Sequence, residues 1–86
     1  MAKQKSTKPS KVFRIGYVSG SIFEHEVEGD SGKRTIRSVN LQRRYKDGDE
    51  TKYSSSFGIA DIPIAIRVLQ LAQEHIEDAE AEVTLD

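Results

Sequence analysis

The sequence predicts an α+β fold, in which an antiparallel twisted sheet of three to four strands is followed by one C-terminal amphipathic helix. Residues 12–59 contain several runs in which apolar and polar side chains alternate, which is the period of a half-buried strand. Residues 61–79 repeat apolar side chains every three or four positions, which is the period of a helix. A chain of 86 residues with 36% hydrophobic content is long enough for one core.

Both ends of the chain are charged and poor in apolar side chains. Residues 1–11 contain four lysines and only two apolar residues, so we expect a disordered basic tail. Residues 80–86 are expected to form an acidic C-terminal tail, which leaves residues 12–79 as the folded domain. No apolar run approaches the roughly 20 residues that span a bilayer, and no signal-peptide core follows the basic start. We therefore expect an intracellular protein, either cytoplasmic or nucleoid-associated.

The first part of the sheet is expected between residues 12 and 27. The run VFRIGYV alternates, with Phe13, Ile15 and Tyr17 on one face. Gly20 separates this run from SIFEHEV and predicts a bulge or bend within one long strand, with two short strands as the alternative. The run EGDSGK, residues 28–33, is rich in turn-forming residues and predicts a turn.

The next strand is a strip of positive charge. The run KRTIRSVNLQRRYK, residues 33–46, holds six cations and no acid in a chain whose formal net charge is −1. On one face of the strip we expect Arg37, Val39, Leu41, Arg43 and Tyr45. On the other face we expect Arg34, Ser38, Asn40, Gln42, Arg44 and Lys46. The run TKYSSSFGI, residues 51–59, also alternates and predicts the last strand.

The loop between these two strands decides which side chains share a face. A two-residue loop at Asp47 and Gly48 would mix apolar and polar side chains on each face. A three-residue loop, residues 46–48 with Gly48 left-handed in a G1 bulge, pairs Leu41 with Tyr53 and makes the apolar faces coincide. We therefore expect the three-residue loop. The other face of the hairpin then holds Ser38, Asn40, Gln42, Arg44, Lys52, Ser54 and Ser56.

The C-terminal helix is expected to begin at Asp61 as N-cap, with Pro63 in the first turn, where a missing N–H costs nothing. Two adjacent apolar stripes follow it. The first stripe is expected to cover the sheet and comprises Ile62, Ala65, Ile66, Leu69, Ala72, Ile76 and Ala79. The second stripe is more apolar surface than a small monomer leaves in water, so we expect it to form a homodimer interface. It comprises Ile64, Val68, Leu71 and His75.

The sequence offers little catalytic or metal-binding chemistry, and we expect no enzymatic activity, metal or cofactor. The chain has no cysteine, so thiolate sites are excluded. His25 lies between Glu24 and Glu26, but neighbours on a strand point to opposite faces and cannot converge on a metal. The serines at 54–56 lack the base and acid that activate a nucleophile, and no phosphate-binding glycine loop is present.

Charge is divided unevenly along the chain. Residues 1–60 carry twelve lysines and arginines against seven acids, whereas residues 61–86 carry Arg67 alone against seven acids. This asymmetry indicates an anionic partner for the basic part of the chain.

The run LQRRYKDGDETK, residues 41–52, followed by SFGIADI, residues 56–62, resembles the positive cofactor four and Whirly-like group of single-stranded DNA-binding proteins. The likeness covers roughly residues 12–78. It implies subunits of element order β-β-β-β-α that dimerise through the helix. It also implies a single-stranded DNA-binding protein that acts as a transcriptional or nucleoid-associated regulator.

The likeness and the charge pattern together imply that the basic strand follows a nucleic-acid backbone. The side chains expected to neutralise phosphates are Arg34, Arg44, Lys46 and Lys52, and those expected to donate hydrogen bonds are Asn40, Gln42, Ser54 and Ser56. Stacking on bases is expected from Tyr17, Tyr45 and Tyr53, with packing in the core as an equal alternative. Phe13, Phe23 and Phe57 are expected in the core.

Two other functions fit the same sequence. One is a dimeric module that binds a protein and no nucleic acid, which the helix stripe and the near-neutral net charge suit equally well. The other is binding of single-stranded RNA, which the sequence does not separate from DNA. Of the three, single-stranded DNA binding by a homodimer is the favoured prediction, without a membrane or a small-molecule substrate as partner.

Overall fold

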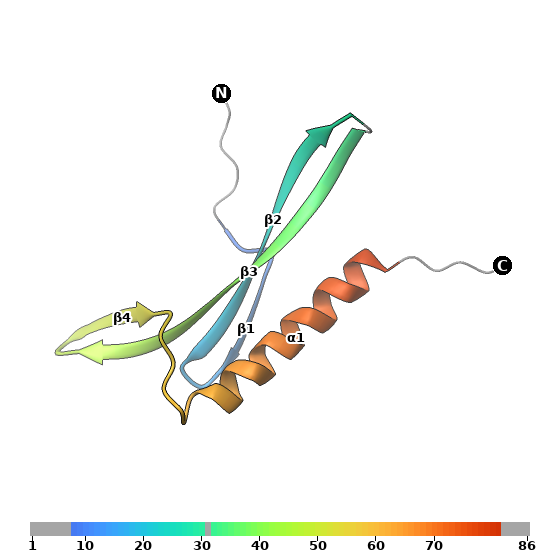
Figure 1. Cartoon of the computed structure of the whole chain (residues 1–86). Coiled ribbons are helices and arrows are strands. Elements are labelled where there is room, and N and C mark those ends of the chain that lie inside the picture. Colours follow the sequence, from blue (N-terminus) through green and yellow to red (C-terminus); the bar gives the residue numbers. More distant parts are fainter. Residues whose placement is uncertain (1–7, 31, 82–86) are drawn as a thin grey trace.

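The computed structural model describes residues 8–30 and 32–81. The elements follow the order β1 (Lys11–Ile15), β2 (Val18–Gly29), β3 (Gly32–Asp47), β4 (Glu50–Ser54) and α1 (Ile62–Glu80). The strands form one antiparallel sheet in the order β1-β2-β3-β4, and α1 runs along one side of it (Figure 1). The predicted α+β class, with a four-stranded antiparallel sheet followed by one C-terminal helix, is therefore confirmed.

The predicted tails lie mostly outside the described residues, which leave out 1–7 and 82–86. One residue assigned to the basic tail, Lys11, belongs to the sheet instead, and Ser10 is hydrogen-bonded to it. The backbone N–H of Ser10 donates to the carbonyl of Ile22 at 2.7 Å, and Lys11 begins β1. At the other end, α1 reaches Glu80, one residue beyond the predicted end.

Gly16, and not Gly20, divides the first part of the sheet. Ile15 faces Val18, so Gly16 and Tyr17 form a two-residue loop between two separate strands. Gly16 has a φ of +60°, as the first loop residue of a type II′ hairpin requires. Gly20 lies inside β2 with regular partners on both sides, so the predicted bulge or bend there was wrong.

The hairpin between β3 and β4 has a two-residue loop, Gly48 and Asp49, in place of the predicted three-residue loop. Gly48 has the predicted left-handed conformation, with a φ of +66°. However, Tyr53 faces Arg44 rather than Leu41. The prediction assumed that β4 extends far enough to cover Leu41. Instead β4 ends at Ser54, and the chain leaves the sheet so that Phe57 can pack under the helix.

The core lies between α1 and one face of β1, β2 and β3. Gly20 is at its centre, because a Cβ built there would lie 2.9 Å from Cγ1 of Val68. The missing side chain lets the helix approach the sheet closely. The buried cluster comprises Val18, Ala65 and Val68, with Phe13, Ile15, Leu41, Phe57 and Ile64 packed against it.

The helix turns the predicted dimer stripe toward the sheet, together with Ala65 and Ala72 of the stripe that was predicted to cover it. Val68, predicted for the dimer interface, is 0% exposed, and its neighbours Ile64, Leu71 and His75 are half-buried. The His75 ring makes an edge contact with Phe13, with centroids 5.9 Å apart. The physical reason is size: Val68 fits above Gly20, and the flanking small residues Ala65 and Ala72 are buried beside it. The stripe left outside contains Ile62, Ile66 and Leu69.

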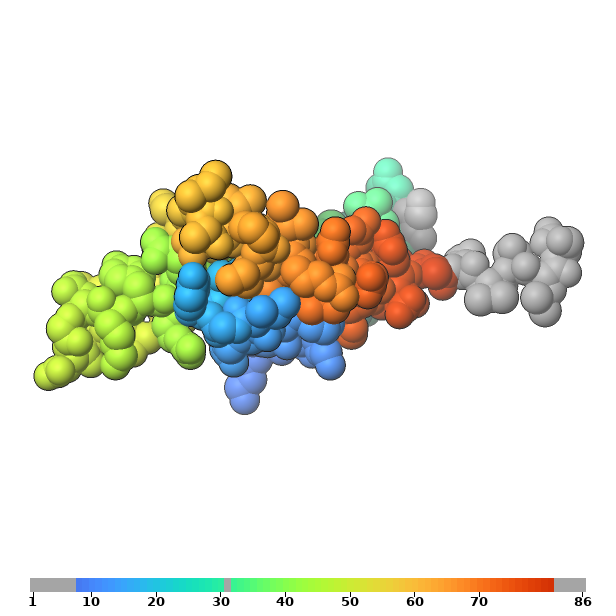
Figure 2. Space-filling model, turned by 90° about the horizontal axis from the view of Figure 1, so that it is seen from below, coloured from blue at the N-terminus to red at the C-terminus, as the bar shows by residue number. Residues whose placement is uncertain are grey.

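Two-stranded segments project from both ends of this core (Figures 1 and 2). Pairing with β1 ends at Ile22, so residues 23–29 and 32–38 form a two-stranded segment that we call the ribbon. At the other end, β4 pairs only with residues 43–47, and we call residues 43–54 the arm. The principal extents of the molecule are 52 × 40 × 16 Å. Its radius of gyration is 16.2 Å, against about 12 Å for a compact chain of this length.

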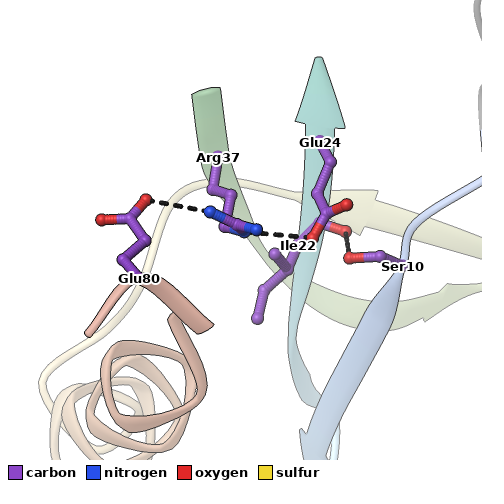
Figure 3. Close-up of polar contacts among 5 residues, drawn as sticks. All are labelled: Ser10, Ile22, Glu24, Arg37 and Glu80. Atoms are coloured by element: carbon purple, nitrogen blue, oxygen red, sulfur yellow. Dashed lines mark hydrogen bonds and ion pairs between the residues drawn. The ribbon is translucent and has the colours of Figure 1, made fainter. Parts of the chain in front are cut away.

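Arg37 ties the ribbon to the C-terminal end of α1 (Figure 3). Its Nε donates to Glu24 Oε2 at 3.0 Å, and its Nη1 donates to Glu80 Oε2 at 3.3 Å. The hydrogen bond to Glu24, followed by the contact with Glu80, raises the pKa of Arg37. The pair of contacts fixes how the ribbon leaves the core.

No helix in the described residues has the length and apolarity to cross a membrane.

Candidate nucleic-acid interface

The face of the sheet turned away from α1 is called here the open face. Facing residues on paired strands point to the same side, so the register assigns each side chain to one face. The open face comprises Val12 and Arg14 of β1, the odd-numbered residues 19–27 of β2, the even-numbered residues 34–46 of β3, and Thr51 and Tyr53 of β4. The even-numbered side of the basic strip therefore lies on the open face, as its alternation predicted.

Charge is separated between the two faces of the sheet. The open face holds Arg14, Arg34, Arg44 and Lys46, and no carboxylate among the described strand residues. The strand carboxylates all lie on the other face: Glu24, Glu26, Glu28, Asp47 and Glu50. None of the four open-face cations forms an ion pair with another described residue. These four charges are therefore available to an anionic partner.

The arm brings an aromatic ring next to two of these cations. Arg44 faces Tyr53 across the hairpin, and Lys46 faces the neighbouring Thr51. Tyr53 is 55% exposed. A groove of about 610 Å³ is lined by Arg44, Tyr45, Lys46, Thr51 and Tyr53. A flat ring beside two cations can stack on a base while the cations neutralise the adjoining phosphates.

A polar path leads from the arm toward the ribbon. Gln42, Asn40 and Ser38 follow Arg44 along the same side of β3, and all three are exposed. Their amide and hydroxyl groups can both donate and accept hydrogen bonds. From Lys46 back to Arg34 the path is about 40 Å long, at about 3.3 Å per strand residue.

Lys52 and Ser54, both predicted to contact nucleic acid, lie on the other face of the hairpin. Lys52 Nζ is 2.9 Å from Asp47 Oδ2 and 3.9 Å from Glu50 Oε1, so its charge is already neutralised. Ser54 Oγ accepts a hydrogen bond from the backbone N–H of Ser56 at 3.0 Å. Their predicted place on the basic face was wrong, because it depended on the three-residue loop.

The three tyrosines separate into different environments. Tyr53 alone lies on the open face. Tyr45 lies on the other face, where the Arg43 guanidinium is 5.6 Å from the centre of its ring. Tyr17 sits in the β1–β2 loop, and its hydroxyl donates to Asp61 Oδ1 at 2.8 Å. Of the predicted stacking residues, only Tyr53 shares the face of the unpaired cations.

Asp61 links Arg43, the first residue of the arm, to the start of α1, and the sequence did not predict this role. Its Oδ1 accepts the Tyr17 hydrogen bond, its Oδ2 accepts from the N–H of Gly58 at 2.9 Å, and Arg43 Nε lies 3.5 Å from Oδ2. The hydrogen bond from Gly58 is the largest cause that lowers the Asp61 pKa, and the bond to Asp61 raises the Tyr17 pKa. Asp61 precedes α1 as predicted, but its side chain makes no helix-capping hydrogen bond.

Phe23 is an open-face aromatic that was predicted to lie in the core. It faces Ser38 across the ribbon and is half-buried. A signal for this was present in the sequence, because neighbouring strand residues point to opposite faces. Since Ile22 is fully buried under the helix, Phe23 must point away from it.

The structure offers no site where side chains converge on a metal or a reacting atom in the part of the chain it describes. His25 lies on the open face, whereas Glu24 and Glu26 lie on the other. No group of three potential metal ligands gathers among the described residues.

Comparisons with known protein families, with curated proteins and with solved structures find no match to this chain. The likeness to the positive cofactor four and Whirly-like group therefore remains a prediction from sequence, and the function is argued from the geometry of the open face.

Proposed function

We propose that the protein binds single-stranded DNA along the open face of its sheet and has no enzymatic activity. The main support is the separation of charge: Arg14, Arg34, Arg44 and Lys46 are unpaired, and no described strand carboxylate shares their face. A surface of this kind attracts phosphates along its whole length. The polar side chains between the cations supply hydrogen-bonding groups for sugars, phosphates and base edges.

A single strand suits this surface better than a duplex. Tyr53 offers an exposed ring on which an unpaired base can stack, whereas the bases of a duplex are stacked inside it. Reading of a major groove needs basic side chains on an inserted element, usually a helix. The only lysine or arginine in α1 is Arg67. We name DNA rather than RNA because of the family likeness.

We also propose that the protein forms a homodimer, in which the two copies pair through the outer side of α1. Ile62, Ile66 and Leu69 form an exposed apolar stripe there, and Ile59 in the preceding loop is 91% exposed. Apolar surface that lies together on a small protein favours an interface. The open faces of both subunits stay free in such a dimer, because α1 covers the opposite side of the sheet.

The proposal is tested by fluorescence anisotropy with labelled oligonucleotides at several salt concentrations. Four phosphate contacts predict that the logarithm of affinity falls with the logarithm of salt at a slope of about −2 to −3 for a single strand. The double variant Arg44→Ala/Lys46→Ala should bind more weakly and have a slope shallower by about 1.4. A duplex of equal length should bind more weakly than the single strand.

A matched control removes two charges from the other face. Lys33→Ala/Lys52→Ala changes the net charge by the same amount, but both side chains point away from the open face. This control should keep the slope of the wild-type protein. If both double variants change the slope equally, binding depends on overall charge and the open face is not the interface. RNA of the same sequence, titrated alongside, measures the preference for DNA.

A further inference from the structure

The open face of the ribbon differs in chemistry from that of the arm. Phe23, Val27 and Ile36 are apolar, and the last two are exposed. Ile36 faces His25, so it lies diagonally next to both Phe23 and Val27. Diagonal neighbours on paired strands are close enough for their side chains to touch. The three residues therefore lie together on one face of the ribbon, with His25 between Phe23 and Val27, and we call Phe23, Val27 and Ile36 the strip.

The strip is not part of the hydrophobic core. The helix covers the face that holds Val18, Gly20 and Ile22, and the strip lies on the reverse side of the same strands. Within the described residues, no helix or strand lies over it (Figure 1). Two exposed aliphatic side chains beside a half-buried phenyl ring favour an occupant.

The charges around the strip indicate what kind of occupant fits. Arg34 faces Val27 directly, and Arg34 forms no ion pair with the described residues. The strand carboxylates of the ribbon are all on its other face. Apolar groups flanked by an unpaired cation suit a ligand with flat apolar faces and negative charge, which describes a nucleotide.

The strip also continues the proposed DNA path. Ser38 faces Phe23 and Arg44 faces Tyr53, so the two aromatic positions are six residues apart along β3. At about 3.3 Å per residue, this separation is about 20 Å. Asn40 and Gln42 fill the interval with polar groups. At the turn, Val27 and Arg34 share a groove with Glu28 and Asp30, and these two carboxylates would repel a phosphate there, so the path ends at Arg34.

We propose that the ribbon holds a second base-stacking subsite of the single-strand interface, in which Phe23 stacks on a base and Arg34 neutralises a neighbouring phosphate. This inference rests on the proposed function. It adds a base contact about 20 Å from Tyr53, so one strand engages both aromatic rings only when it is long enough to reach from the arm to the ribbon. Strands too short to do so bind at one ring alone.

The test measures affinity against strand length, with oligothymidylates of about 4 to about 16 nucleotides, the range of site sizes known for single-strand-binding folds. The variant Phe23→Leu keeps an apolar side chain but removes the ring, and Phe23→Tyr keeps the ring. We expect Phe23→Leu to weaken binding of the longest strand by roughly 5-fold or more, as for the loss of one stacked base. The loss should shrink as the strand shortens, and Phe23→Tyr should bind like the wild type.

The outcomes separate this inference from the proposed function. If Phe23→Leu matches the wild type at every length while Arg44→Ala/Lys46→Ala binds weakly, the open face binds DNA but the second subsite is wrong. If the wild type binds no strand, both proposals fail. If Phe23→Leu instead changes the mass measured by light scattering and leaves affinity unchanged, the strip is a contact between copies of the chain. Circular dichroism of both variants shows whether the sheet is intact.

Discussion

Asp61 shows how much a single side chain contributes to the position of the arm. Its carboxylate receives hydrogen bonds from Tyr17 and Gly58 and lies beside Arg43, so it joins the β1–β2 loop, β3 and the start of α1. These contacts lower its pKa in the folded protein. A carboxyl group with a lowered folded pKa stabilises the protein above its unfolded pKa, about 3.9, and this stabilisation is lost as the pH falls through the folded value.

We therefore expect Asp61→Asn to lower the urea midpoint at pH 7, and the difference from wild type to narrow below about pH 4. The measurement is a series of urea melts from neutral to acid pH. Asp49→Asn is the control, since Asp49 lies in the exposed arm loop and has no ion pair within the described residues. A difference for Asp61→Asn that stays constant over the pH range would contradict the role given to its charge.

Local alternation placed the faces of the basic strip correctly, but it also put Tyr17 on a strand and extended the last strand beyond Ser54, where distant contacts decide the structure. The even-numbered side chains from Arg34 to Lys46 share a face because the strand period is local and needs no knowledge of the fold. Tyr17 and Asp61 are 44 residues apart, and nothing near either one indicates their hydrogen bond. The sequence therefore left base stacking and core packing as equal alternatives for Tyr17. The structure shows a third role, in which its hydroxyl donates to Asp61.

At the scale of elements, a single glycine decides which side of α1 meets the sheet. Apolar periodicity gave two adjacent stripes, and the prediction turned the first one to the sheet, although both contain branched side chains that can form a core. The choice depends on the fit of Val68 over Gly20. The β3–β4 register was mispredicted for a related reason. The prediction matched apolar faces because it assumed that side chains of β4 must cover those of β3. In the structure Leu41 is covered by the helix instead.

Gly20→Ala tests this packing. The added Cβ would lie 2.9 Å from Val68 Cγ1, so either the helix or the side chain must move. Overpacking of this kind destabilises by roughly 1–3 kcal/mol. Gly29→Ala is the matched control, because the nearest atom to its Cβ would be 4.0 Å away. Urea melts give the free energies of unfolding.

The double variant Gly20→Ala/Val68→Ala makes the test specific. Removing the Val68 methyl groups gives the new Cβ room, so the double variant should be less destabilised than the sum of the two single variants. If the two effects simply add, Gly20 and Val68 are not in the contact described, and the face of α1 must be assigned again.

The whole molecule is too extended to hide its apolar surface. The ribbon and the arm project from a small core, and a two-stranded hairpin by itself is only marginally stable in water. The outer stripe of α1 adds Ile62, Ile66 and Leu69 to the exposed surface. A second copy that covers this stripe would bury it and enlarge the core without using the basic open faces.

Light scattering tests the proposed homodimer. We expect the wild-type protein to have twice the 9.6 kDa mass of one chain, independent of salt, because apolar burial and not charge would hold the copies together. Ile66 is 51% exposed on the outer stripe, so Ile66→Glu should give the monomer mass with an unchanged circular dichroism spectrum. Arg67→Glu places the same side chain on the neighbouring exposed position and should stay dimeric. A wild-type mass of 9.6 kDa at every concentration would overturn the homodimer, whereas a dimer that Ile66→Glu leaves intact would place the interface elsewhere.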